Sequence, residues 1–208
     1  ADQTSNLELF ATLSHEGFPG HLYQTIYFLK TSPADIRTLI TSSGYVEGWA
    51  TYIESYGYQY AARDLDDPAA TDYTRLIALN RRINLCLYSL LDIGIHYYGW
   101  DETQAARLLQ FFGITDAHVV SEIFQYIVET PANYQKYCWG CLNFLDLKKE
   151  WKDTLGDDFN LKAFHQNLLE IGPVQFPVLQ KYMNERLQKK YKEVPVRTSH
   201  FMTVYNIF

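Results

Sequence analysis

The sequence predicts an all-α protein. Hydrophobic residues recur with helical periodicity almost throughout, helix-capping signals separate the periodic segments, and alternating strand-like runs joined by hairpin turns are missing. The one exception is the tail at residues 201–205, which alternates as a strand would. A length of 208 residues fits one domain, so we expect a single multi-helix domain over residues 1–208.

Capping residues indicate where several helices begin and end. Ser32-Pro33-Ala34-Asp35 combines an N-cap, a first-turn proline and a capping-box acid. Asp101-Glu102-Thr103-Gln104 repeats that arrangement, Gly113 ends the same helix, and Thr130-Pro131 starts another. The expected helices span residues 5–30 (interrupted), 33–40, 45–63, 70–98, 101–112, 116–128, 131–145, 160–170 and 174–192.

The charge balance argues against a general nucleic-acid binder. The chain has 18 Lys and Arg against 24 Asp and Glu, a net charge of −6, whereas phosphate binding requires a clustered basic surface. The basic residues within 188–192 are expected to form the solvated end of a helix. No apolar run approaches the roughly 20 residues of a membrane span. Residues 1–4 do not resemble a signal peptide, so the compartment stays open between the cytoplasm and export by a signal before residue 1.

The cysteines predict no site of their own. Cys138 and Cys141 form a C-x-x-C pair, and Cys86 is the third cysteine. A redox pair of that kind is expected in a βαβ setting, and a cysteine zinc site needs a second pair. We therefore interpret Cys138 and Cys141 as incidental.

The heptapeptide His15-Glu16-Gly17-Phe18-Pro19-Gly20-His21 resembles a stretched form of the zinc-binding motif H-E-x-x-H. In the common motif two histidines four residues apart share a helix face and bind zinc, while the glutamate acts on water. Here the spacing is six, which leaves the rings about 120° out of alignment on a regular helix. The intervening glycines and proline favour a bulge over residues 17–20 that restores the alignment.

The next long helix is expected to supply a third ligand. Glu47 lies at the border of an apolar stripe, where a buried carboxylate needs a partner. Two histidines and a carboxylate with a fourth position open are the usual composition of a catalytic zinc site. We therefore predict one Zn²⁺ held by His15, His21 and Glu47. Glu54, on the same helix face, is expected to orient a ligand histidine or else to form a surface salt bridge.

Three segments together resemble one known family. They are residues 15–21, residues 45–54 (YVEGWATYIE) and the helix end at residues 92–100, which reads D-x-G-x-H-x-x-G-W. The chain resembles, from about residue 9 to residue 177, the bacterial domain-of-unknown-function family 885 (DUF885), related to Glu-zincins and to angiotensin-converting-enzyme-like helical carboxypeptidases.

This resemblance implies a function and a site. It implies a zinc peptidase in which His15, His21 and Glu47 bind the metal and Glu16 is the general base. Members of the family are longer and carry these motifs near their C-terminus. We therefore expect the chain to be the C-terminal catalytic part of a longer bacterial peptidase.

The helix expected over residues 70–98 carries a polar stripe on an otherwise apolar surface. Arg82, Ser89, Asp92 and His96 fall within a sector of about 80° around its axis. Such a stripe is expected either to face a cleft or to pair internally in a buried structural network. We favour the cleft, with His96 and Arg82 contacting a substrate oxygen or carboxylate and Asp92 holding the His96 ring.

Other residues receive weaker assignments. In the segment from residue 130 to residue 140, which resembles the family pattern P-G-Q-A-x-S-Y-K-x-G, Tyr137 matches a tyrosine that donates to the oxyanion in related peptidases. Lys136 and its neighbours at 132–134 depart from that pattern. His165 either lines the pocket or packs between helices. His118 and His200 are expected at the surface.

The leading function is hydrolysis of a peptide substrate by zinc, with Glu16 as base and Tyr137 or His96 stabilising the oxyanion. Two alternatives stay open. Two histidines and a carboxylate also bind iron in oxygenases, although the glutamate next to His15 suits a hydrolase. The chain could also be a helical module that binds a metal without catalysing a reaction. The sequence leaves the cleavage position and the oligomeric state open.

Overall fold

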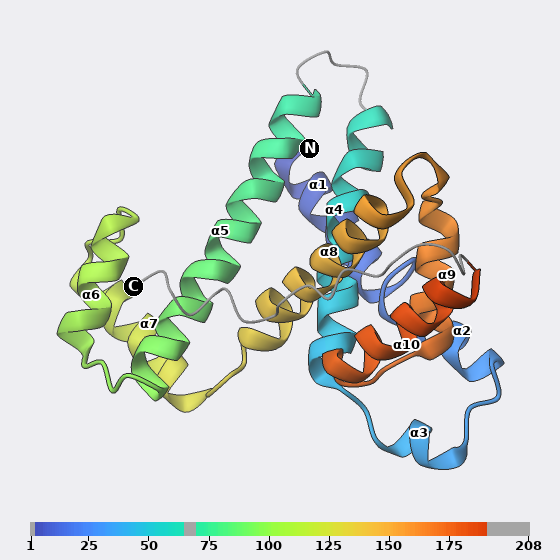
Figure 1. Ribbon diagram of the computed structural model, residues 1–208. Helices are drawn as coiled ribbons and strands as arrows, with labels where there is room; N and C mark the ends of the chain where they lie inside the picture. Colours follow the sequence, from blue (N-terminus) through green and yellow to red (C-terminus); the bar gives the residue numbers. More distant parts are fainter. Residues whose placement is uncertain (1–2, 65–69, 191–208) are drawn as a thin grey trace.

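The computed structural model describes residues 3–64 and 70–190, and within these ranges it consists of helices and loops without strands (Figure 1). The predicted all-α class is confirmed. The helices are α1 (Gln3–Glu16), α2 (His21–Lys30), α3 (Asp35–Leu39), α4 (Ser43–Asp64), α5 (Ala70–His96), α6 (Glu102–Phe111), α7 (Ala117–Glu129), α8 (Gln135–Leu155), the short 3₁₀ helix η1 (Gly156–Asp158), α9 (Leu161–Ile171) and α10 (Phe176–Lys190).

The helix predicted over residues 131–145 is wrong at both ends. Ala132 has a φ of 60°, a left-handed conformation that interrupts helical geometry, so α8 begins only at Gln135. At the other end the helical spacing of apolar residues continues through Leu147 and Trp151, which are buried. The strand-like tail at residues 201–205 lies outside the described residues.

The larger of two apolar cores lies where α4, α8, α9 and α10 pack together (Figure 1). Trp49 of α4 and Phe144 of α8 are buried at its centre, with ring centroids 6.0 Å apart in an edge-to-face arrangement. The Tyr45 ring is fully buried, and its hydroxyl donates a hydrogen bond of 2.7 Å to the Leu168 carbonyl of α9. This bond satisfies a polar group that would otherwise be costly to bury.

Two glycines allow α4 and α8 to cross in backbone contact. A Cβ atom at Gly48 would lie 2.4 Å from the carbonyl carbon of Gly140. One at Gly140 would lie 2.2 Å from the Gly44 carbonyl oxygen. Because neither position tolerates a side chain, the crossing brings Glu47, next to Gly48, close to the first turn of α8.

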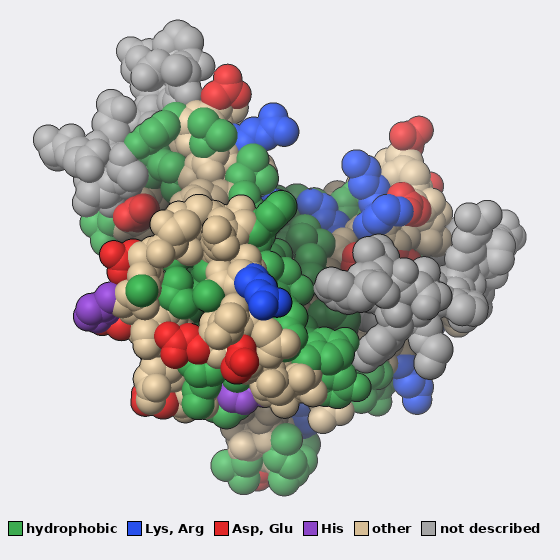
Figure 2. All heavy atoms as spheres, turned by 90° about the vertical axis from the view of Figure 1, so that its left-hand side faces the viewer, with side chains coloured by type: hydrophobic (Ala, Val, Ile, Leu, Met, Phe, Trp, Pro, Cys, Tyr) green, Lys and Arg blue, Asp and Glu red, His purple; other side chains and the backbone are tan. Residues whose placement is uncertain are grey.

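A second, smaller core joins α5 to α6 and α7 at the other end of the molecule (Figure 1). Leu87 and Leu91 of α5 pack there against Leu109 of α6 and Ile127 of α7. Among the described residues on the face shown in Figure 2, acidic and basic side chains are interspersed. None of the described helices combines the length and apolarity that crossing a bilayer requires.

Candidate metal centre

The heptapeptide folds as two helix ends joined by a tight connection. His15 is the penultimate residue of α1 and His21 is the first residue of α2, so the predicted break over residues 17–20 is confirmed. A Cβ atom at Gly20 would lie 1.8 Å from the His15 carbonyl oxygen, which restricts this position to glycine. The indole of Trp49 donates to the Pro19 carbonyl at 3.0 Å. The two imidazole rings consequently lie 4.7 Å apart, nearly perpendicular.

Glu47 of α4 meets both histidines through one oxygen. Its Oε2 lies 3.5 Å from His15 Nε2 and 3.2 Å from His21 Nε2. Four ligands about 2.1 Å from a tetrahedral zinc ion stand about 3.4 Å from one another. The two measured separations bracket that value, so Glu47 Oε2 lies at a distance from each histidine nitrogen that suits a shared zinc ion.

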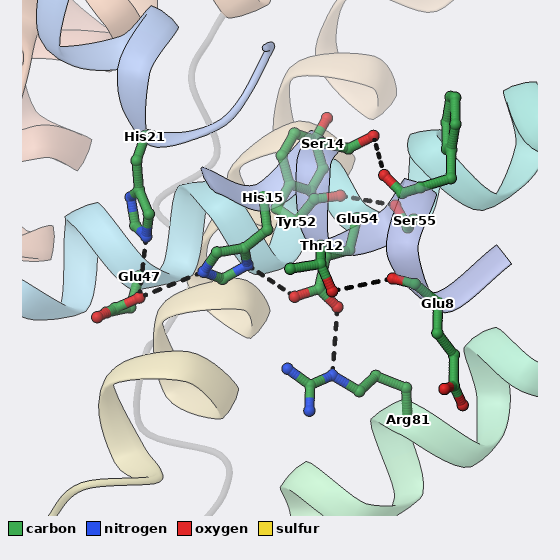
Figure 3. Close-up of polar contacts among 11 residues, drawn as sticks. Glu8, Thr12, Ser14, His15, His21, Glu47, Tyr52, Glu54, Ser55 and Arg81 are labelled. Carbon is green, nitrogen blue, oxygen red and sulfur yellow. Dashed lines mark hydrogen bonds and ion pairs between the residues drawn. The ribbon is translucent and has the colours of Figure 1, made fainter. Parts of the chain in front are cut away.

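Glu54 orients His15 from the opposite side of the ring (Figure 3). Its Oε1 lies 2.7 Å from His15 Nδ1, and the Glu54 side chain is buried. A proton on Nδ1 leaves the Nε2 lone pair directed toward Glu47. Burial lowers the pKa of His15, but the hydrogen bond to Glu54 and the charges of Glu54, Glu16 and Glu47 outweigh it, so the pKa is raised above 6.5.

His21 and Glu16 complete the group. Nitrogen and oxygen atoms of His15, Glu16 and His21 that could bind a metal lie within 4.8 Å of one another. Glu16 is exposed, unlike Glu47, and is therefore open to solvent or a substrate. His21 Nδ1 is buried without a hydrogen-bond partner among the described residues, so packing rather than a second carboxylate orients this ring.

A pocket of about 300 Å³ opens beside His15 and Glu16. Its walls come from α1, α4, α5, α7, the segment that joins α7 to α8, and the first turn of α8. The other residues that line it are Thr12, Glu54, Arg81, Leu85, Tyr126, Asn133, Tyr134 and Tyr137. The pocket gives a ligand access to the histidine–glutamate cluster.

The first turn of α8 brings two more side chains to Glu47. The Tyr137 ring lies 6.3 Å from His15, centroid to centroid. Burial and then the charge of Glu47 raise the pKa of Tyr137 above 10, against the opposing effect of Lys136, so its hydroxyl keeps its proton. Lys136 Nζ lies 3.6 Å from Glu47 Oε1, the oxygen that the histidines do not contact. In the sequence, Lys136 is only a departure from the family pattern, and nothing near it indicates this contact.

The polar stripe on α5 forms a structural network rather than facing the cluster. Ser89 Oγ donates to the Tyr134 carbonyl at 3.3 Å, and the Ala132 amide donates to Asp92 Oδ1 at 3.1 Å. His96 Nε2 donates to the Ile127 carbonyl at 2.9 Å. We therefore correct our interpretation of His96 as a substrate contact. Asp92, which was expected to hold the His96 ring, lies 3.8 Å from its Nε2 through Oδ1. The network holds the α7–α8 segment, which forms one wall of the pocket.

Arg82 also departs from its predicted place, and its neighbour takes that place. Arg82 lines a separate pocket of about 490 Å³ between α4 and α5, together with Ser55 and Gln59. Arg81 instead reaches the candidate metal centre, where its Nε donates to Glu54 Oε2 at 3.4 Å (Figure 3). Arg81 lies about 100° away from Arg82 around the helix and therefore falls outside the predicted polar stripe.

His165 packs in the large core and not in the pocket. Its Nε2 lies 2.8 Å from the Tyr52 hydroxyl, and its ring contacts Trp49 edge to face. Burial, with a smaller effect of Lys148, lowers its pKa to about 4. Of the two predicted surface histidines, His118 is exposed as expected. His200 lies outside the described residues.

The cysteines pair differently from the C-x-x-C spacing. Cys138 Sγ lies 3.6 Å from Cys86 Sγ of α5, while Cys141 is buried and all three are free thiols. The hydrogen bond from Cys138 lowers the pKa of Cys86 to about 6. Burial opposes this shift, and the positive charge of Arg82 adds to it. Burial raises the pKa of Cys141 to about 11. Cys138 and Cys141 thus do not act as a pair.

Comparisons with known proteins place the chain among bacterial relatives. Residues 1–183 match the family described as "Bacterial protein of unknown function (DUF885)". The crystal structure of a "putative lipoprotein" from Colwellia psychrerythraea has a TM-score of 0.68 and 28% identity, over 86% of this chain and 30% of that one. A "putative lipoprotein of unknown function" from Shewanella oneidensis gives 0.67 and 26%, over 89% and 32%. This chain thus spans under a third of the length of both. No curated protein matches it.

Proposed function

The chain belongs to the DUF885 family of bacterial proteins, and from the geometry of its histidine–glutamate cluster we propose that it is a zinc-dependent peptidase. One observation carries the proposal: a single oxygen of Glu47 lies at ligand-to-ligand distance from the Nε2 atoms of both His15 and His21. Glu16, the carboxylate that would act as the general base of a hydrolase, lies next to this group and is open to solvent.

Each residue of the cluster has a separate role in the proposed hydrolysis. His15, His21 and Glu47 would hold the zinc ion, which would supply Lewis acidity to polarise a carbonyl and to lower the pKa of a water molecule to about 7. Glu16 takes a proton from the attacking water and passes it to the leaving amine as the carbon–nitrogen bond breaks. Tyr137 remains protonated and donates its hydroxyl hydrogen to the oxyanion that develops in between.

Two charged neighbours keep the ligands in place. Glu54 holds the His15 ring, and substitutions at such positions typically weaken metal binding about 10–100-fold. Lys136 neutralises the second oxygen of Glu47, which leaves Oε2 for the metal. The two lipoprotein neighbours fit an exported location, which we include in the proposal.

The Glu16→Gln variant tests the function because it removes the base and preserves the shape. We expect the parent chain to bind one zinc ion per molecule and to cleave peptides from a defined mixture, measured by mass spectrometry. The variant should keep its zinc and cleave about 10²–10⁴-fold more slowly. Glu8→Gln, at an exposed position of the same helix, is the matched control and should change neither value.

Two results would contradict the proposal. A zinc-loaded Glu16→Gln variant with the parent's rate would mean that Glu16 is not the base. A zinc-loaded parent that cleaves no peptide bond would leave only a metal-binding module. Iron in place of zinc, with uptake of dioxygen, would instead support the oxygenase alternative.

A further inference from the structure

Arg81 provides a permanent positive charge in a pocket that two glutamates also line. Among the described residues that line the pocket, it is the one arginine or lysine. Glu16 and Glu54 line the same space, so an anionic group can enter only where the guanidinium faces it. The side chain is 48% exposed, and its charge is therefore available to a ligand.

The guanidinium group is held in a fixed direction. Nε donates to Glu54 Oε2, and Glu54 is itself buried and bonded to His15. Figure 3 shows the two terminal nitrogens on the side of the guanidinium that does not face Glu54. Four N–H donors remain on these nitrogens in the planar fork that matches a carboxylate.

The pocket supplies further donors beside Arg81. Burial, followed by the charges of neighbouring tyrosines, raises the pKa of Tyr134 to about 12, so its hydroxyl stays protonated at neutral pH. Asn133 lies next to it in the α7–α8 segment that Ser89 and Asp92 hold. The Tyr134 hydroxyl and the Asn133 amide can thus donate hydrogen bonds to a carboxylate that Arg81 binds, from a segment that is held in place.

The distance to the metal ligands suits a peptide. One carboxylate, that of Glu54, links His15 to Arg81, so the two nitrogens it contacts are at most about 8 Å apart. One residue of extended chain spans about 3.3–3.6 Å. The bound refers to His15 Nδ1, and the Nε2 atom that faces Glu47 lies on the far side of the same ring. A carboxylate on Arg81 is therefore within a few residues of a carbonyl group next to His15.

We infer that Arg81 is the binding site for a carboxylate of the peptide substrate, close to the bond that is cleaved. The inference rests on the proposed function. The carboxylate comes either from the free C-terminus of the peptide or from an Asp or Glu side chain. Both sources offer the same two oxygens to the guanidinium, and the experiment separates them.

Peptide binding to the metal-free chain tests this without relying on catalysis. Three N-acetylated tetrapeptides serve as probes: one with a free C-terminus and no acidic residue, its C-terminal amide, and that amide with one Glu. Dissociation constants and the Arg81 Nε–H signal are followed by NMR. We expect at least tenfold tighter binding of a carboxylate peptide than of the neutral amide, and the tight probe identifies the source.

Variants connect that preference to one side chain. Arg81→Gln should abolish the preference, and Arg82→Gln, at the adjacent arginine of the other pocket, should keep it. Should Arg81→Gln fail to fold, Arg81→Lys keeps the charge without the fork and should lose at least half of the preference. Equal binding of all three probes, no binding at all, or a preference that survives Arg81→Gln would overturn the assignment.

The outcomes separate this inference from the proposed function. If the preference depends on Arg81 but the zinc-loaded parent cleaves nothing, the carboxylate site stands and the peptidase proposal fails. If the parent cleaves peptides but binds neutral and carboxylate probes equally, the peptidase proposal stands and Arg81 has no role in specificity.

Discussion

Gly48→Ala tests whether the backbone contact between α4 and α8 is needed for stability. The added methyl group would lie 2.4 Å from the carbonyl carbon of Gly140 and 2.5 Å from its Cα. Ordinary contact between carbon atoms needs about 3.5 Å or more, so the helices must separate by about 1 Å. No side chain can move aside in their place, because both obstructing atoms belong to the backbone.

The loss of stability in Gly48→Ala follows from the packing that is disturbed when α4 and α8 move apart. Trp49 and Phe144 pack across the same crossing, and overpacking of a close-packed core costs about 1–3 kcal/mol. We take the upper value because the backbone cannot yield. Alanine regains about 1 kcal/mol of helix propensity, which leaves a net loss of about 2 kcal/mol. For a chain of this length that lowers Tm by about 4–8 °C.

Gly44→Ala is the matched control, since it makes the same change one turn earlier on α4. Its Cβ atom would meet only Phe176 Cε2, at an ordinary 3.5 Å. Thermal and urea unfolding, followed by circular dichroism, should show Gly48→Ala well below the parent and Gly44→Ala equal to it or above it. Equal midpoints for the two variants would refute the close-packing argument.

Glu54→Gln should weaken zinc binding about 10–100-fold in a chelator competition, because His15 loses a charged partner; unchanged affinity would show that Glu54 does not orient the ring. The free energy of unfolding should fall by at most about 3 kcal/mol as pH drops from 6.5 to 4, because burial and Lys148 lower the pKa of His165 to about 4 and the unfolded chain takes up the proton first. In urea titrations, the free energy of unfolding of His165→Phe should change less between pH 6.5 and 4 than that of the parent. The same pH dependence in both chains would argue against this role of His165. Iodoacetamide should alkylate Cys86 with a midpoint near pH 6, whereas Cys138→Ala should shift the midpoint toward 9; mass spectrometry at a series of pH values measures both.

The sequence predicted the helices and the histidine pair because both depend on local chemistry. The break between His15 and His21 follows from glycine and proline, whatever the remainder of the chain does. The predicted start of α8 was wrong for the opposite reason. The left-handed Ala132 is stabilised by Asp92, which lies 40 residues earlier, and no pattern near residue 132 indicates that contact.

The choice among polar side chains could not be made from periodicity alone. Arg81 and Arg82 are neighbours on one helix, and which of them faces the site depends on how α5 crosses α4. Histidine is a residue type that often acts in catalysis, but His96 donates to the backbone carbonyl of Ile127, a contact that sequence patterns do not reveal. Lys136 contacts Glu47 only because two glycines bring their helices together.

The Trp49 indole ties the segment between His15 and His21 to the large apolar core, so that this segment unfolds together with the core. Its ring is buried in the large core, and its N–H bonds the Pro19 carbonyl between the two histidines. The connection cannot open without disturbing that core, so the amide of Gln24, bonded to the Gly20 carbonyl, should exchange hydrogen nearly as slowly as the core of α4. The histidine spacing then persists in the metal-free chain, and an added metal raises stability through mass action instead of inducing the fold.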